Sequence, residues 1–288
     1  MDRNIKIGIC GAVSSGKSTL INAIFGDIVS GTGIGRTTID VKHMNYTRAH
    51  IQVPESVKVT IIDTPGSSDV ELGEIRNESF LALRSCHIII HVIDLLDYAK
   101  PTSDLTAKVN DVINRVIRSS SIGKNIIRVV NKGDHKSEEY TQIFQKLQRE
   151  FRNVVQIHAS AACIRNFTGD IDKHKKELKN IINSFAQPKI SSANMLTQTV
   201  IQQIVQDYSV SGNDLTGFDE LVSIINRFIA GRCHQMLIDS LKCQPTHTLT
   251  QKMDQYLEIK QICTDLNKPY LDSYADHLNY DENCCRLL

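Results

Sequence analysis

The stretch GAVSSGKS, residues 11–18, constrains the fold of this chain more than any other. It follows an apolar run at residues 5–10 and precedes a segment with helical periodicity that ends at Gly26. Its two glycines let the backbone curl, so that successive N–H groups form a nest for an anion next to the positive end of the helix. The pattern G-x-x-x-x-G-K-S in this strand–turn–helix context therefore predicts a phosphate-binding loop, with a glycine-rich linker as the alternative.

The residue types of this loop indicate how a phosphate chain would be bound. Lys17 would reach the outer phosphates, and the Ser18 hydroxyl would hold Mg²⁺. We expect the remaining contacts to come from the rest of the loop and the first helical turn, at Gly11, Ser14, Ser15, Gly16 and Thr19.

Short apolar runs alternate with helical patterns over the first 157 residues. We expect strands near residues 5–10, 41–46, 57–62, 88–93, 125–131 and 154–157, with helices at about 102–118 and 137–150 between the later ones. The run IIIHVI at 88–93 is typical of a central parallel strand that is buried on both faces. The fold class predicted is α/β, with helices on both faces of a mostly parallel sheet in three layers.

Two of these strands end in polar residues. The strand at 57–62 leads into Asp63-Thr64-Pro65-Gly66, and the strand at 125–131 leads into the cluster NKGD. The carboxyl ends of parallel strands meet at one edge of the sheet, where α/β folds bind ligands. We therefore expect Asp63 to lie at the same edge as the phosphate loop, although DTPG and NKGD could each also form an ordinary turn.

The pattern becomes purely helical after Ser160. Amphipathic segments at 170–185 and 194–208 precede the apolar helix FDELVSIINRFI, which we expect to close the sheet domain. The predicted organisation is a domain over 1–242 with a helical insertion at about 164–213, followed by a helical tail over 243–288.

Composition limits the partners and the location that we expect. The 33 Lys and Arg against 32 Asp and Glu give a net charge of +1, which predicts no electrostatic attraction for nucleic acid. The amino terminus lacks the features of a secretory signal, and no apolar run approaches the roughly 18 residues of a membrane span. The eight scattered cysteines suit a reducing cytoplasm, and His87 and His91 have no ligand partner nearby in sequence, so Mg²⁺ is the only metal expected.

The order phosphate loop, threonine-bearing loop, DTPG and NKGD resembles the motif series of translation-factor-type P-loop GTPases over residues 5–163. The resemblance implies binding of GTP and GDP, with guanine read by the N-K-x-D residues Asn131, Lys132 and Asp134. A carboxylate there accepts two hydrogen bonds that adenine cannot supply. Asp63 would order a water on Mg²⁺, and the Gly66 amide would meet the γ-phosphate. The resemblance further implies Thr38, with Thr37 as the alternative, as a magnesium ligand, and Ser160-Ala161 as the base-supporting motif.

Within this class, GAVSSGKSTLINAIFG looks most like the dynamin-like GTPases, with the Era and tRNA-modification types as close relatives. This resemblance implies a membrane-associated switch that hydrolyses GTP slowly, self-associates through its GTPase domains, and uses Lys17, Ser14 and Thr38 in catalysis. Ser14 occupies the loop position at which such relatives organise a monovalent cation such as K⁺. Ser67 stands where Ras-like proteins have a catalytic glutamine. The alternatives are a module that binds GTP without hydrolysing it, and an Era-like GTPase associated with RNA or the ribosome.

The last five residues, CCRLL, place Cys285 at the C-a-a-X spacing, whose terminal leucine suggests geranylgeranylation. Stable anchoring needs a second signal, which palmitoylation of Cys284 would supply. The alternative is that Cys284 and Cys285 have this spacing by chance and carry no lipid. On this hypothesis the protein is cytoplasmic and lies peripherally on a membrane surface through its lipid.

Overall fold

The computed structural model describes residues 3–31, 40–47, 50–65, 73–95, 105–120, 124–132, 138–186, 189–209 and 216–242. Several predicted features lie outside these residues. They are the threonine-bearing loop with Thr37 and Thr38, Gly66 and Ser67, Asp134, and the helical tail over 243–288 with Cys284 and Cys285.

The described residues contain a six-stranded sheet with the order β2-β3-β1-β4-β5-β6. Its strands are β1 (Asn4–Gly11), β2 (Lys42–Tyr46), β3 (Lys58–Asp63), β4 (Ile88–Asp94), β5 (Asn125–Asn131) and β6 (Val154–Gln156). β2 pairs antiparallel to β3, and every other pairing is parallel. The predicted mostly parallel sheet is confirmed, with the edge strand as its antiparallel member.

Alternation along β1 assigns the two faces of the sheet. Ile5, Ile7 and Ile9 are fully buried in the larger core, whereas Cys10 belongs to a second cluster on the other face. Because successive side chains of a strand point to opposite faces, this pattern requires a helical layer on each side.

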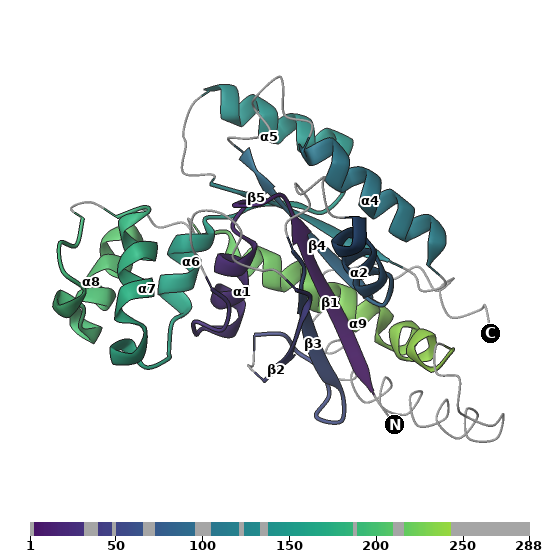
Figure 1. Ribbon diagram of the computed structural model, residues 1–288, viewed down its shortest axis with the longest axis horizontal. Coiled ribbons are helices and arrows are strands. Elements are labelled where there is room, and N and C mark those ends of the chain that lie inside the picture. The colour runs from purple at the N-terminus through teal and green to yellow at the C-terminus, as the bar shows by residue number, and fades with distance from the viewer. Residues whose placement is uncertain are drawn as a thin grey trace, which may run out of the picture.

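The helices supply these layers (Figure 1). The larger core receives side chains from α1 (Lys17–Phe25), α6 (Ala159–Asn166) and α9 (Phe218–Lys242). The opposite face packs against α2 (Gly73–Arg84), α4 (Leu105–Ser119) and α5 (Glu138–Glu150). The three-layer α/β architecture predicted from the sequence is thus confirmed.

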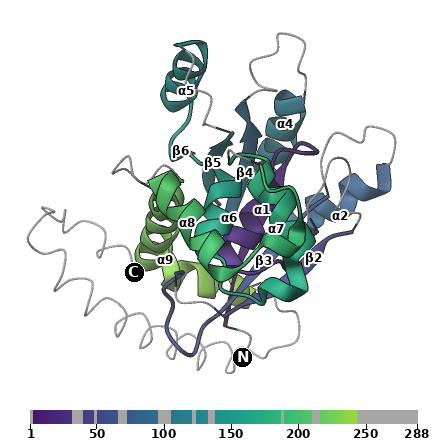
Figure 2. The ribbon, with the colours of Figure 1, turned by 90° about the vertical axis from the view of Figure 1, so that its left-hand side faces the viewer.

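Two further helices lie between α6 and α9 in the chain. They are α7 (Ile171–Asn183) and α8 (Gln198–Ser209), joined by a segment with a 3₁₀ turn, η1 (Ala193–Met195). Both views place them together at one end of the molecule, next to α6 (Figures 1 and 2). They occupy the stretch for which a helical insertion is predicted, while the domain boundaries themselves stay a prediction.

The structure differs from one sequence expectation at α2. The segment 64–77, which contains DTPG, is predicted from the sequence to be a loop that responds to the nucleotide, but residues 73–77 form the first turns of α2. Ser160 and Ala161 follow the last strand, as predicted, and lie in the first turn of α6. His158 caps this helix, because its imidazole Nδ1 accepts a hydrogen bond of 3.2 Å from the Ala161 amide. Histidine is an uncommon cap, so sequence patterns do not indicate it.

Gly217 lies directly before α9, where the backbone passes close to Gln156 at the end of β6. It adopts a φ of +61°, and a Cβ there would lie 1.9 Å from the carbonyl oxygen of Gln156. A glycine is therefore required for α9 to start beside the sheet. α9 runs to Lys242, and within the described residues no helix has the length and apolar character needed to cross a membrane.

Candidate functional site

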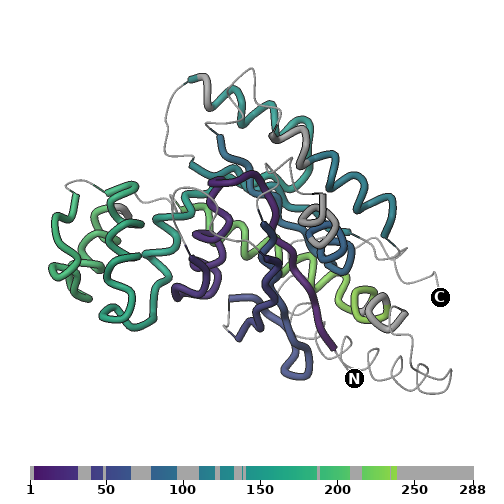
Figure 3. Tube along the Cα trace, in the orientation of Figure 1, coloured from purple at the N-terminus to yellow at the C-terminus, as the bar shows by residue number. Residues whose placement is uncertain are grey.

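The predicted phosphate loop connects β1 directly to α1, as the Cα trace shows (Figure 3). Gly16 precedes α1 with a left-handed φ of +97°, and a Cβ at this position would lie 2.1 Å from Nδ2 of Asn131. Ser14 is also left-handed, with a φ of +59°. Such conformations turn backbone N–H groups inward at the positive end of a helix, which is the geometry of an anion nest.

Lys17 is held inside this loop. Its side chain is 7% exposed, and its Nζ donates hydrogen bonds to the carbonyl oxygens of Ala12, at 2.7 Å, and Gly11, at 3.2 Å. Burial lowers the pKa of Lys17, while the charge of Asp63 acts in the opposite direction. A buried ammonium bound mainly by neutral carbonyls is costly, so an anion entering the loop would stabilise it.

Ser15 adds a second polar group to the interior of the loop. Its hydroxyl oxygen is buried and has no hydrogen-bond partner among the described residues. Buried polar groups in native proteins are normally bonded, so this hydroxyl suits a ligand that brings acceptor oxygens. The loop therefore fits a phosphate chain on two observations besides its sequence: a buried cation and an unsatisfied hydroxyl.

Asp63 ends β3, the strand next to β1, at the edge of the sheet where the loop lies. Its side chain is fully buried, and Oδ2 accepts a hydrogen bond of 3.0 Å from the Ser30 hydroxyl. Ser18 lies in the first turn of α1. A carboxylate and a hydroxyl are the oxygen ligands that Mg²⁺ prefers, so these residues fit the metal expected beside a bound nucleotide. The third predicted ligand, Thr38, lies outside the described residues.

Asn131 ends β5 and touches both the loop and α6. Its Nδ2 donates to the Ser15 carbonyl oxygen at 2.9 Å, and its Oδ1 accepts from the Ala159 amide at 3.0 Å. Asn131 and the phosphate loop thus meet at one edge of the sheet. Lys132 is left-handed, with a φ of +62°, and forms an ion pair with Asp94 at the end of β4.

The predicted base-supporting residues, Ser160 and Ala161, lie in α6, and their role stays a prediction. Ala159, two residues before Ala161, donates the amide hydrogen bond to Asn131. The Ala161 amide is bound by His158, and the Ser160 hydroxyl lies 3.1 Å from the Ser184 hydroxyl. The segment that follows β6 therefore contacts Asn131 through the Ala159 amide, whereas Ser160 contacts Ser184, the residue that follows α7.

Sequence reasoning missed several polar residues that support the site. Asn22 is fully buried on α1, Ser30 is 2% exposed, and Asp94 pairs with Lys132. Asn22 carried a usable signal, because a polar residue at a core position of a helix needs a buried partner. For Ser30, Asp94 and His158 the sequence around each residue contains no pattern that would indicate its role.

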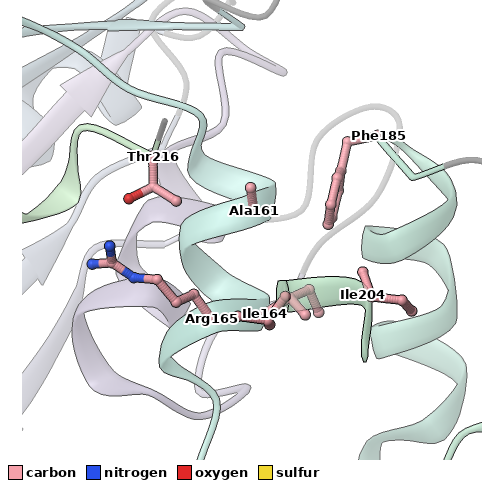
Figure 4. A pocket seen from close by; sticks show the side chains of 7 residues that line it. Ala161, Ile164, Arg165, Phe185, Ile204 and Thr216 are labelled. Carbon is pink, nitrogen blue, oxygen red and sulfur yellow. The ribbon is translucent and has the colours of Figure 1, made fainter. Parts of the chain in front are cut away.

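A small pocket lies apart from the loop, on the side of α6 that faces α8 (Figure 4). It is lined by Ala161, Ile164, Arg165, Phe185, Ile204, Val205 and Thr216. Its volume is ≈ 10 Å³, about the space of one water molecule. This pocket is therefore too small to be the nucleotide site.

Comparison with known proteins agrees with this geometry. A family model described as 50S ribosome-binding GTPase matches residues 6–132. The chain has the P-loop GTPase fold. In sequence the chain is similar to GTPase Der of Helicobacter hepaticus, at 28% identity over 216 residues that cover 72% of this chain and 40% of that protein. GTPase Der of Wolinella succinogenes is 27% identical over 206 residues, which cover 69% of this chain and 40% of that protein.

The chain thus spans about two fifths of the length of these curated relatives. A crystal structure of Aquifex aeolicus Era bound to GDP·AlF₄⁻ has a TM-score of 0.43 and 18% identity, covering 68% of this chain and 62% of the other. These two sequence matches are to Der-type GTPases and give no support to the dynamin-like subdivision. Nor do they support the expectation that nucleic acid is no partner. Prenylation and K⁺ binding stay predictions.

Proposed function

We propose that this chain binds GTP, hydrolyses it to GDP and phosphate with Mg²⁺, and acts as a nucleotide-dependent switch. The observation that carries the proposal is the meeting of three elements at one sheet edge. The Lys17 loop follows β1, Asp63 ends β3, and Asn131 ends β5 with a hydrogen bond back to the loop. One nucleotide spanning this edge would contact a phosphate nest, a metal-binding carboxylate and a base-reading motif.

The residues at this edge suggest separate roles in phosphate binding, metal binding and hydrolysis. The Lys17 ammonium and the loop amides would hold the β- and γ-phosphates, and Mg²⁺ beside Ser18 would neutralise charge that develops on the phosphate oxygens. Water would attack the γ-phosphorus and GDP would leave. Ser67 cannot orient that water as an amide can, so we expect slow hydrolysis by the isolated protein.

Nucleotide titrations of the full chain test the binding step. GTP and GDP should bind much more tightly than ATP, and Asp134→Asn should shift the preference toward xanthine nucleotides, because the amide presents a donor where the carboxylate accepts. Asp111→Asn, the same change at an exposed position on α4, should leave the preference unchanged. Equal affinity for ATP and GTP would refute the proposal.

Single-turnover assays with and without K⁺ separate the switch from a module that only binds GTP. Release of phosphate that depends on Mg²⁺ and disappears in Lys17→Met supports hydrolysis. Intact GTP under every condition, with nucleotide binding retained, would favour the binding module.

A ribosomal partner is the second candidate function, favoured by the description of the matching family as 50S ribosome-binding. Our candidate surface for a polyanion is on α7, which carries four lysines, of which Lys173 and Lys176 are exposed and three residues apart. Lys175 pairs with Asp172, and Lys179 donates to the Ser191 carbonyl.

Co-sedimentation with 50S ribosomal subunits tests this candidate. Sedimentation should depend on the bound nucleotide, weaken with salt, and fall in the double variant Lys173→Glu/Lys176→Glu. Lys146→Glu on α5 is the matched control. No sedimentation with GDP or with a GTP analogue would exclude this partner.

A further inference from the structure

The segment that follows α1 contacts the buried carboxylate of Asp63 through one hydroxyl group. Ser30 Oγ donates to Asp63 Oδ2 at 3.0 Å, and the two side chains are 2% and 0% exposed. The donor lies 33 residues before the acceptor in the chain. A hydrogen bond to an ionised carboxylate inside the protein is among the stronger polar contacts and fixes the orientation of the group.

Asn22 fixes the position of Ser30. Its Oδ1 accepts hydrogen bonds from the amides of Ser30, at 2.8 Å, and Val29, at 3.0 Å, while its Nδ2 donates to the Ser30 carbonyl oxygen at 2.9 Å. Asn22 is fully buried, and it belongs to the same helix as Lys17 and Ser18. The backbone of Ser30 is therefore attached at both its N–H and its C=O to the helix that begins at the phosphate loop.

These contacts form a chain from α1 to the strand end: Asn22 holds Ser30, and Ser30 holds Asp63. A carboxylate that takes part in a metal site needs such partners, because the group that hydrogen-bonds it decides which oxygen faces the ion. The Lys17 charge lies close enough to influence Asp63, so the same carboxylate also balances the buried ammonium. A change in its orientation would alter both the metal site and the loop.

We propose that Ser30 is a positioning residue for the magnesium site of this GTPase. By donating to Oδ2, it holds the Asp63 carboxylate in the orientation that favours Mg²⁺ beside the nucleotide. Ser30 is followed by Gly31 and then by the stretch that contains Thr37 and Thr38, so it also links Asp63 to the start of that loop. The proposal rests on the proposed function, because it presumes that a guanine nucleotide and Mg²⁺ bind at this edge.

The test compares nucleotide affinity in the presence and absence of the metal. Affinity of the full chain for fluorescently labelled GDP is measured with millimolar Mg²⁺ and with EDTA. The affinity with Mg²⁺ divided by the affinity in EDTA gives the contribution of Mg²⁺. Ser30→Ala should reduce this ratio about tenfold, the usual cost of removing an outer partner of a metal ligand, and leave the affinity in EDTA unchanged. Ser30→Cys keeps the size but is a weak donor, and it should give a similar loss.

Two variants serve as controls. Ser30→Thr keeps the hydroxyl and should retain the ratio. Ser85→Ala removes a hydroxyl that donates to the Ala82 carbonyl at 2.7 Å, at the end of α2, and should leave the ratio unchanged. Thermal unfolding of each variant without nucleotide shows whether it is folded, and the comparison of Ser30→Ala with Ser30→Cys decides the test if the extra methyl of threonine is not tolerated.

The possible outcomes separate the inference from the proposed function. An unchanged or larger ratio in Ser30→Ala and Ser30→Cys overturns the positioning role. An equal loss of affinity in both conditions also overturns it, because Ser30 would then only support the fold of the loop. Failure of the unaltered chain to bind GDP or GTP in either condition would instead refute the proposed function.

Discussion

Asn131 Nδ2 donates a hydrogen bond of 2.9 Å to the carbonyl oxygen of Ser15, which joins the end of β5 to the phosphate loop across 116 residues of sequence. On its other side, Oδ1 accepts from the Ala159 amide at 3.0 Å. One buried side chain thus holds the loop, the predicted base-reading motif and the start of α6 in a fixed relation. The proposed base and phosphate sites are therefore coupled even without a nucleotide.

Replacing Asn131 by Ala should destabilise the protein and weaken nucleotide binding together. Two buried backbone groups would lose their partners, at a cost of about 1–3 kcal/mol each. Denaturant unfolding without nucleotide measures the first effect, and GDP titration measures the second. Asn125→Ala, at the other end of the same strand, removes a hydrogen bond of 3.4 Å and should cost less stability and no affinity. Equal effects of the two substitutions would contradict the coupling.

Lys17→Met should abolish tight nucleotide binding while leaving the nucleotide-free protein as stable as the parent, or more stable. The Lys17 ammonium is buried and bound by carbonyl oxygens, and methionine fills a similar volume without a charge to desolvate. Melting temperatures measure both effects in one assay: the value without GDP gives the stability of the nucleotide-free protein, and the rise on adding GDP reports nucleotide binding. A large loss of stability in the nucleotide-free variant would show that the lysine supports the fold rather than the ligand.

His91 should make the protein sensitive to acid. Burial, with smaller contributions from the charges of Arg128 and Lys17, lowers the pKa of His91 from 6.5 to about 3. Between these values the unfolded state binds one more proton than the folded state, so stability falls as pH decreases below 6.5. Between pH 7 and pH 5 this amounts to about 2 kcal/mol.

His91→Leu should remove that part of the pH dependence, because leucine does not titrate. Urea unfolding at pH 7 and pH 5 measures the difference for the parent and the variant. His43→Leu, at an exposed position of β2, is the control and should retain the parent's difference. The same difference in all three proteins would show that His91 is not the group responsible.

Gly217→Ala should be strongly destabilising, by about 2 kcal/mol or more. The residue has a left-handed φ, and the added Cβ would lie 1.9 Å from the Gln156 carbonyl oxygen, so α9 would have to move away from β6. Gly231 lies inside α9, and a Cβ there would meet nothing within 4 Å, so Gly231→Ala should instead stabilise by up to about 1 kcal/mol. Thermal unfolding compares the two, and similar effects would argue against the close approach.

The sequence by itself determined the fold class and the principal residues of the site. Alternating apolar residues such as Ile5, Ile7 and Ile9 specify a strand, and GAVSSGKS specifies a turn that a strand and a helix flank. Asp63 ends an apolar strand, so its place at the carboxyl edge of the sheet followed from the parallel order. These features depend on residues that are close in sequence, where periodicity and backbone chemistry act.

Only the tertiary structure decided which groups support these residues. Asn22, Ser30 and Asp63 meet because α1 and β3 pack together, and the Ala159 amide reaches Asn131 because α6 begins at Ala159, shortly after β6. A hydrogen bond between distant residues requires donor and acceptor to be brought together by the packing of the whole domain. No local pattern records that arrangement, since each partner alone has the composition of an ordinary helix, loop or strand end.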